Sequence, residues 1–348
     1  MQAGLRIQTL VYAILFCVVS MCGMIFFARN KAIEISNVAQ DQVVVENALS
    51  AGEQEESGSL RFRQEETATE YLCIPLESGV KAENVIIENH YMERQVWIYI
   101  KNTSSGFYAK EAIAGDLNGI TEGNYEYAGG ITLIKFTLSD VYECKSVLEE
   151  GKLYINFVPP TEVYEKIVVI DAGGGGSEYG ATAGSMFEKD INLDILKQLK
   201  ALLDSSDIKV YYTRTGDKDV TNEERIALAN ATGADMFISI QLNASDDATL
   251  YGAEAFYNGQ YFTPGFNSVE LADLTERNVV MQISTRGNGL FAAGEEDVLL
   301  QSATVPATVI KVGYATHPQE AELLQDAAYR QKIAQGLYDA ILTAYEEN

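Results

Sequence analysis

Histidine and basic residues are both scarce in this sequence of 348 residues. Only His90 and His317 are present, so any zinc site built on two or three histidines would have to draw on these two. Lysine and arginine total 25 against 50 aspartates and glutamates, which gives a formal net charge of −25. A charge of this sign repels phosphate backbones and argues against nucleic-acid binding. The hydrophobic content of 47% excludes wholesale disorder, and the length favours two domains.

Cysteine is also sparse, with four residues in the whole chain. Cys17 and Cys22 fall within a long apolar run near the N-terminus. Cys73 and Cys144 are left, and they would form one disulfide if the compartment is oxidising. Two separate buried thiols are the alternative, and the sequence leaves both open.

The N-terminal apolar run has no charged residue from position 7 to position 28. As a helix it would be about 33 Å long, enough to cross the core of a bilayer. The run ends with Phe26-Phe27-Ala28, which has a bulky side chain where a signal-peptide cleavage site needs a small one. We therefore predict a cytoplasmic stub at 1–6 and an uncleaved transmembrane anchor at 7–28, with cleavage or lipidation as the alternative. Basic residues on both flanks leave the orientation undecided by charge.

Two further regions precede a change of pattern after residue 160. Residues 29–70 are rich in acidic side chains and are predicted to be a flexible spacer. Residues 71–160 are predicted to form a small β-rich domain, because β-branched and aromatic residues recur in short runs between glycine turns. Strands are expected at 95–100, 131–138 and 153–158. One short helix is expected at 139–150, with Ser139 as its cap and Gly151 as its stop.

Four aromatic residues of the β-rich region, Trp97, Tyr99, Tyr125 and Tyr127, have two interpretations. They form either a surface on which a sugar stacks or part of the core of their own sheet. The second interpretation is favoured, because aromatic residues in the strands of a small domain usually supply its core.

From residue 166 onward, segments of strand and helix character alternate. Strands are expected at 166–170, 208–213, 236–240, 253–257 and 308–312. Helices are expected from Glu188 through Leu203, from a capping box at Thr221 to Asn230, and from Ala328 to Tyr345. This alternation predicts an α/β fold in which helices cover both faces of a sheet.

A glycine-rich turn, DAGGGGSEYG at 171–180, follows the first of these strands. It matches neither the dinucleotide-binding fingerprint nor the P-loop, whose lysine is absent from the turn. Glu178 and Glu188 instead place negative charge where a phosphate group needs positive potential. Nucleotide binding is therefore disfavoured.

Five sequence blocks follow one another between residues 166 and 346: IVVIDAGGGGSEYGA, EKDINL, VYYTRTGDKDVTNEERIALAN, ADMFISIQLNA and PATVIKVGYATHPQEAELL. Together they resemble the zinc-dependent N-acetylmuramoyl-L-alanine amidases of the amidase 3 family. The resemblance implies an amidase-like domain at 166–348, and hydrolysis of the amide that joins the lactyl group of muramic acid to the first alanine of the peptidoglycan stem peptide. It also implies one zinc ion held by His, Glu and His, with a further Glu assisting the attacking water. The small β-rich domain in front resembles the AMIN type of cell-wall-binding module.

At three of the four positions that carry the family's chemistry, this sequence has a different residue. Gly174 and Gln241 stand where the family has its two histidine ligands, in the turn D-P-G-H-G-G and the strand end S-I-H-x-N-A. Glu188 keeps the ligand glutamate, whereas Lys311 stands at the position of the assisting glutamate. Glycine offers no ligand atom, glutamine is a weak zinc ligand and a lysine ammonium repels the metal. No cofactor is therefore expected.

Residues that build the frame of the family are kept, among them Thr213, Arg214, Asp217, Arg225 and Asn230. The expected vestigial groove consists of Asp171, Gly174, Glu178, Glu188, Gln241, Asn243 and Lys311. Without metal Glu188 would lack a counter-charge, so we predict that it pairs with Lys311. The alternative is that both side chains turn to solvent.

A chain that keeps the frame of an enzyme but loses its chemical groups resembles a pseudoenzyme. We expect a single-pass protein of the cell membrane, with extracellular C-terminal domains, that is not catalytic. It would bind the glycan or the stem peptide of peptidoglycan, or regulate a wall-remodelling protein. The alternative is an active N-acetylmuramoyl-L-alanine amidase with a rearranged site, which would need zinc.

Overall fold

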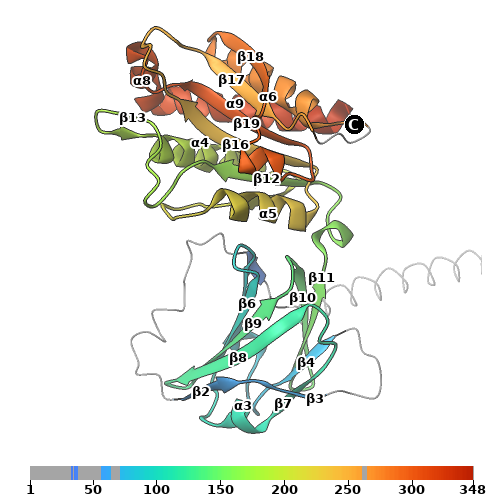
Figure 1. Ribbon diagram of the computed structural model, residues 1–348. Helices are drawn as coiled ribbons and strands as arrows, with labels where there is room; N and C mark the ends of the chain where they lie inside the picture. The colour runs from blue at the N-terminus through green and yellow to red at the C-terminus, as the bar shows by residue number, and fades with distance from the viewer. Residues whose placement is uncertain (1–32, 34, 38–55, 64–70, 261–264, 348) are drawn as a thin grey trace, which may run out of the picture.

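The computed structural model describes residues 33, 35–37, 56–63, 71–260 and 265–347, which form two domains (Figure 1). The predicted stub and transmembrane anchor at 1–28 lie outside these residues. In the described part of the chain, no helix is long and apolar enough to span a membrane.

The N-terminal domain consists of two β-sheets that share one apolar core (Figure 1). The first sheet has the order β1 (Ile35–Asn37), β5 (Val85–His90), β6 (Gln95–Lys101), β9 (Ile131–Leu138), β8 (Ile120–Ala128) and β2 (Glu56–Ser59). The second has the order β10 (Glu143–Glu149), β11 (Lys152–Val158), β4 (Leu72–Pro75), β7 (Ala112–Gly115) and β3 (Arg61–Arg63). The described residues of this domain also form three short helices, η1 (Ala82–Asn84), α3 (Phe107–Lys110) and η2 (Pro160–Glu162). The predicted β-rich region is confirmed.

Residues 139–150 do not form the expected helix, because β10 occupies most of this segment. β10 pairs with β11 along its whole length, in an antiparallel register from Glu143↔Val158 to Glu149↔Lys152. Glu150 and Gly151 close the hairpin with φ angles of 49° and 73°. Two positive φ angles are typical of a two-residue hairpin turn. Pairing with the following strand therefore overrides the helix-capping signals that we read at Ser139 and Gly151.

The acidic region 29–70 is not entirely spacer. Its described segments belong to the sheets: β1 pairs with β5, β2 with β8 and β3 with β7. The Glu56 carboxylate accepts hydrogen bonds from the hydroxyls of Tyr125 (2.8 Å) and Ser105 (2.7 Å). These contacts join residues far apart in sequence, so the acidic composition alone did not reveal them.

The cysteines outside the apolar run are separate, half-buried thiols. Cys73 lies on β4 and Cys144 on β10, with β11 between them. Two strand spacings correspond to about 10 Å, whereas a disulfide requires Cα atoms within about 7 Å. The disulfide interpretation is therefore wrong for this structure. Burial raises the pKa of the Cys144 thiol.

The aromatic residues of this domain mostly serve its core. Tyr99 and Tyr125 are only 0% and 5% exposed, so the sugar-stacking interpretation is wrong for these two. Trp97 is half-buried, stacks on His90 with ring centroids 4.1 Å apart, and lies beneath the ammonium of Lys135.

The C-terminal domain is an α/β sheet with helices on both faces, as predicted (Figure 1). Its strand order is β15 (Lys209–Tyr212), β12 (Ile167–Ala172), β16 (Met236–Asn243), β19 (Ala307–Tyr314), β17 (Ala253–Tyr257) and β18 (Gly287–Ala292). β15, β12, β16 and β19 are parallel, whereas β17 is antiparallel to β19. Only β18, among the sheet strands, was not expected from the sequence.

Two apolar clusters hold the helices to the sheet. On one face lie α4 (Glu188–Leu203), α6 (Ser268–Ile283) and α9 (Ala327–Glu347), and on the other α5 (Asn222–Thr232) and α7 (Val298–Gln301). The helix α8 (Pro318–Gln325) follows β19, and the two-residue strands β13 (Thr182–Ala183) and β14 (Met186–Phe187) precede α4. α4, α5 and α9 were predicted, and the capping box of Thr221 and Glu224 is present. α6 and α7 were not.

The two domains meet at the β15 edge of the α/β sheet. Tyr91 of the N-terminal domain is buried there, and its hydroxyl donates to the carbonyl of Tyr212 at 2.9 Å. Glu143 accepts a hydrogen bond from the hydroxyl of Tyr211 at 2.5 Å and pairs with Lys209 at 2.8 Å. Buried polar contacts of this kind require correct geometry, so they define how the domains are docked.

Gly336 lies where α9 packs closely against the backbone of α6. A Cβ atom at this position would lie 2.8 Å from the Cα of Val279 and 2.9 Å from the carbonyl oxygen of Asn278. We expect Gly336→Val to lower the free energy of unfolding by about 1–3 kcal/mol, because two helix backbones must separate. Urea denaturation would measure this, with Gln331→Val on the exposed side of α9 as the control. Equal denaturation midpoints for the two variants would contradict the prediction.

Candidate functional site

The four positions singled out from the sequence converge where the parallel strands end. Gln241 on β16 and Lys311 on β19 are direct neighbours across the sheet. The Glu188 carboxylate, at the start of α4, accepts a hydrogen bond from the backbone N–H of Leu242 at 2.8 Å. A Cβ atom on Gly174 would lie 3.3 Å from the Cβ of Lys189. The structure therefore brings these four positions together.

A fully buried ion pair lies beneath the glycine-rich turn. Asp171, at the end of β12, pairs with Arg225 of α5, and their side chains are 0% and 1% exposed. Asp171 also accepts hydrogen bonds from the hydroxyls of Thr213 (2.5 Å) and Ser239 (2.6 Å). Arg225 donates further to the carbonyls of Ala172 (2.8 Å) and Gly174 (2.7 Å). The pair thus holds the turn in place from below.

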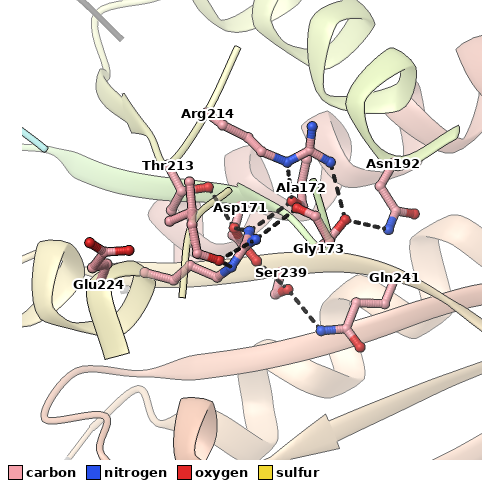
Figure 2. Close-up of polar contacts among 12 residues, drawn as sticks. Asp171, Ala172, Gly173, Asn192, Thr213, Arg214, Glu224, Ser239 and Gln241 are labelled. Carbon is pink, nitrogen blue, oxygen red and sulfur yellow. Dashed lines mark hydrogen bonds and ion pairs between the residues drawn. The ribbon is translucent and has the colours of Figure 1, made fainter. Parts of the chain in front are cut away.

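A second buried arginine holds the same turn from another direction (Figure 2). Arg214 donates to the carbonyls of Ala172 (2.8 Å), Gly173 (3.1 Å) and Lys189 (2.9 Å). Burial lowers the pKa of Arg214, and the nearby carboxylate of Asp171 opposes this effect. Because arginine presents several donors in a rigid plane, one side chain can bind both the turn and the start of α4.

The outer half of the turn is bound by two exposed aspartates. Asp217 accepts from the ammonium of Lys189 (2.8 Å) and the N–H of Gly176 (2.8 Å). Asp219 accepts from the N–H (2.7 Å) and the hydroxyl (2.6 Å) of Ser177. The hydrogen bond from Lys189 lowers the pKa of Asp217, and that from the Ser177 hydroxyl lowers the pKa of Asp219.

These lowered pKa values predict that acid weakens the turn. A carboxylate with a depressed folded-state pKa stabilises the fold above its ordinary pKa, about 3.9, and the contribution disappears as the pH falls through the folded-state value. The Tm difference between the wild type and Asp217→Asn should therefore be present at pH 6 and shrink below about pH 4. Asp246→Asn is the control, because that side chain makes no hydrogen bond within the described residues. A Tm difference that does not change with pH would refute the prediction.

Glu188 does not pair with Lys311, so that prediction was wrong. The carboxylate of Glu188 accepts backbone N–H groups from Ala181 (2.7 Å) and Leu242 (2.8 Å). These two donors satisfy the charge without a lysine. Lys311 instead points, like Val309 on the same strand, into a cavity on the face covered by α5 and α7, whereas α4 covers the other face.

The cavity beside β19 has a volume of about 470 Å³. Three of the predicted groove residues line it, namely Glu178, Gln241 and Lys311. The other four do not: Asp171 lies buried beneath the turn, Gly174 and Glu188 lie at the turn and at α4, and Asn243 is buried at the end of β16. Phe256 and the start of α7 complete the cavity. The sequence singled out neither, although Phe256 lies in a predicted strand.

The residues at the family's metal position do not fit zinc. The described residues contain no group of three His, Cys, Asp or Glu side chains able to hold a metal. His90 is buried in the N-terminal domain beside Glu88, at 3.1 Å. His317 caps α8, and its Nδ1 accepts the N–H of Glu320 at 3.3 Å. Neither histidine therefore lies among the four positions that the resemblance assigns to the metal site.

The fold and the position of the site define an amidase-type α/β domain. Residues 168–343 match the family model described as N-acetylmuramoyl-L-alanine amidase, and the chain belongs to this family. The family implies peptidoglycan as the substrate. The resemblance expected from the sequence is confirmed at this level.

Several known proteins are similar to this chain. The germination-specific N-acetylmuramoyl-L-alanine amidase of Bacillus subtilis (strain 168) is 30% identical over 198 residues, which covers 52% of this chain and 81% of the relative. The uncharacterized protein YqiI of the same strain is 33% identical over 182 residues, covering 52% and 86%. A solved N-acetylmuramoyl-L-alanine amidase from Clostridium difficile 630 is 32% identical with a TM-score of 0.49, covering 53% and 98%.

Proposed function

We propose that this chain is a cell-wall-facing amidase-family protein that binds peptidoglycan without zinc-dependent hydrolysis. Residues 7–28 would anchor it in the cell membrane, and residues 29–348 would face the wall. One observation carries the proposal. The arginine and aspartate frame of the site is complete, whereas three of its four chemical positions hold Gly174, Gln241 and Lys311.

The first test combines metal content, binding and hydrolysis. We expect the purified protein to contain much less than one zinc per chain, to sediment with insoluble peptidoglycan and to leave the wall uncleared. Inductively coupled plasma spectrometry, a pull-down and a turbidity assay measure these three quantities. An active amidase of the family serves as the control for metal and clearing. Stoichiometric zinc together with wall clearing would refute the proposal.

Active hydrolysis is the second candidate, and the comparisons weigh in its favour. The germination-specific relative from Bacillus subtilis is an N-acetylmuramoyl-L-alanine amidase, so this similarity alone points to an amidase. The site would then need a ligand set different from the family's. A regulatory role, in which the domain docks on a wall-remodelling protein, is separated by the same pull-down, because it predicts no sedimentation with purified peptidoglycan.

A further inference from the structure

Lys311 lines the cavity beside β19 and forms no ion pair with any residue that the structure describes. Its side chain is half-buried, and its ammonium lies 4.9 Å from the centroid of the Phe256 ring. Glu254 lies opposite Lys311 on β17, but its carboxylate accepts the hydroxyl of Tyr314 and the amide of Asn288 (3.5 Å). The half-buried ammonium of Lys311 can therefore still form a charge-assisted bond with an anionic group of a ligand.

The remaining charges of the cavity are negative. Glu178 from the glycine-rich turn, Glu223 from α5 and Glu296 before α7 all line it. None of these three carboxylates has a hydrogen-bond or ion-pair partner among the described residues. Asp297 also lines the cavity, but its side chain accepts the N–H of Leu300 at 3.0 Å and so caps α7.

This charge distribution favours a ligand that carries charges of both signs. A purely anionic ligand would meet Lys311 but would be repelled by three carboxylates. A purely cationic ligand would pair with the carboxylates but would leave Lys311 without a partner for its charge. A ligand that carries both an ammonium and a carboxylate satisfies both sets of charges.

The size and the apolar wall of the cavity fit a short peptide. Its volume of about 470 Å³ lies within the usual range of small-molecule sites. Phe256 and Val298 line it, and Phe291, which is 43% exposed, packs against Phe256 with ring centroids 5.5 Å apart. These side chains offer apolar contacts for small residues such as alanine.

We propose that this cavity binds the free stem peptide. A carboxylate of the peptide pairs with the ammonium of Lys311, and its N-terminal ammonium pairs with the carboxylates of Glu178, Glu223 and Glu296. The inference rests on the proposed function and specifies its ligand. In intact peptidoglycan the first alanine is part of a neutral amide. Hydrolysis of that amide adds one water and leaves a carboxylate on the sugar and an ammonium on the peptide. The site therefore binds the free peptide more tightly than the same peptide in uncut peptidoglycan, where the carboxylate contact with Lys311 remains and the ammonium contact is lost.

Calorimetry on the full chain tests this proposal. The probe is alanyl-isoglutaminyl-alanine, which has one ammonium and one carboxylate at neutral pH. We expect it to bind, and its N-acetylated and C-amidated forms each to bind at least about tenfold more weakly. Lys311→Met should weaken the free peptide about tenfold and abolish the difference between the free and C-amidated forms. Lys332→Met, on the exposed side of α9, is the matched control.

Three outcomes would overturn the proposal. The first is equal affinity of the wild type and Lys311→Met for the free peptide. The second is Lys311-dependent binding of glycan stripped of its peptides, which would place the anion on the sugar. The third is a chain that sediments with intact peptidoglycan but ignores the free peptide, which refutes this inference alone. Binding of the free peptide without sedimentation would instead refute the proposed function and leave the peptide site in place.

Discussion

Replacing Arg225 by methionine should lower the free energy of unfolding by about 3–5 kcal/mol. The substitution leaves Asp171 as a fully buried carboxylate without its cation, and a buried charge without a partner is costly. It also removes the donors to the carbonyls of Ala172 and Gly174. Urea denaturation of the purified protein measures the change.

Two variants make this measurement specific. Arg277→Met breaks a pair with Asp273 in which both side chains are more than half exposed, at 55% and 52%, so we expect a loss of less than about 1 kcal/mol. Arg225→Lys keeps the charge but loses the planar set of donors, and its loss should be intermediate. Similar losses for Arg225→Met and Arg277→Met would show that the buried pair does not stabilise the fold.

Restoring the family's groups should create a zinc site where none of the present residues fits one. The triple variant Gly174→His, Gln241→His and Lys311→Glu places the three family groups at positions whose backbones lie close to Glu188, at the ends of the parallel strands. We expect about one zinc per chain, because the four positions already converge. Glu188 accepts two backbone N–H groups and the side-chain amide of Asn192 (3.5 Å), and a carboxylate has about four acceptor sites, so one is left for a metal.

The triple variant should also be less stable than the wild type when zinc is absent. Gly174 has φ +69°, and a Cβ atom there would lie 2.9 Å from the carbonyl oxygen of Glu178. Such a strained position costs about 1–3 kcal/mol. Zinc at 1,000 times its Kd should raise the free energy of unfolding of this variant by about 4 kcal/mol. Thermal melts with zinc and with chelator measure both effects.

The double variant Gln241→His and Lys311→Glu is the matched control for this experiment. It keeps the unstrained glycine at 174 and lacks one ligand, so it should melt near the wild type and bind zinc much more weakly. A triple variant that folds but takes up no zinc would contradict our placement of the four positions. The wild type should show no change of Tm on adding zinc.

Much of the α/β domain was predictable because its signals are local. The strand 253–257 and the capping box at Thr221 depend on residues within one turn or one strand, and β17 and α5 form there. We assigned the four chemical positions from the order of the sequence blocks that resemble the family, and the family model covers this part of the chain. α7 escaped prediction because it has only four residues, too few for a periodic pattern.

The sequence by itself determined the alternation of strands and helices and the family, because both depend on short contiguous patterns of residues. Only the tertiary structure decided which side chains meet. It turned 143–149 into a strand by pairing it with β11, and it added 56–63 to the sheets of the N-terminal domain. It also gave Glu188 two backbone N–H donors and placed Lys311 in a cavity on the other face of the sheet. These outcomes depend on contacts between residues far apart in the chain, and such contacts leave no mark in local periodicity.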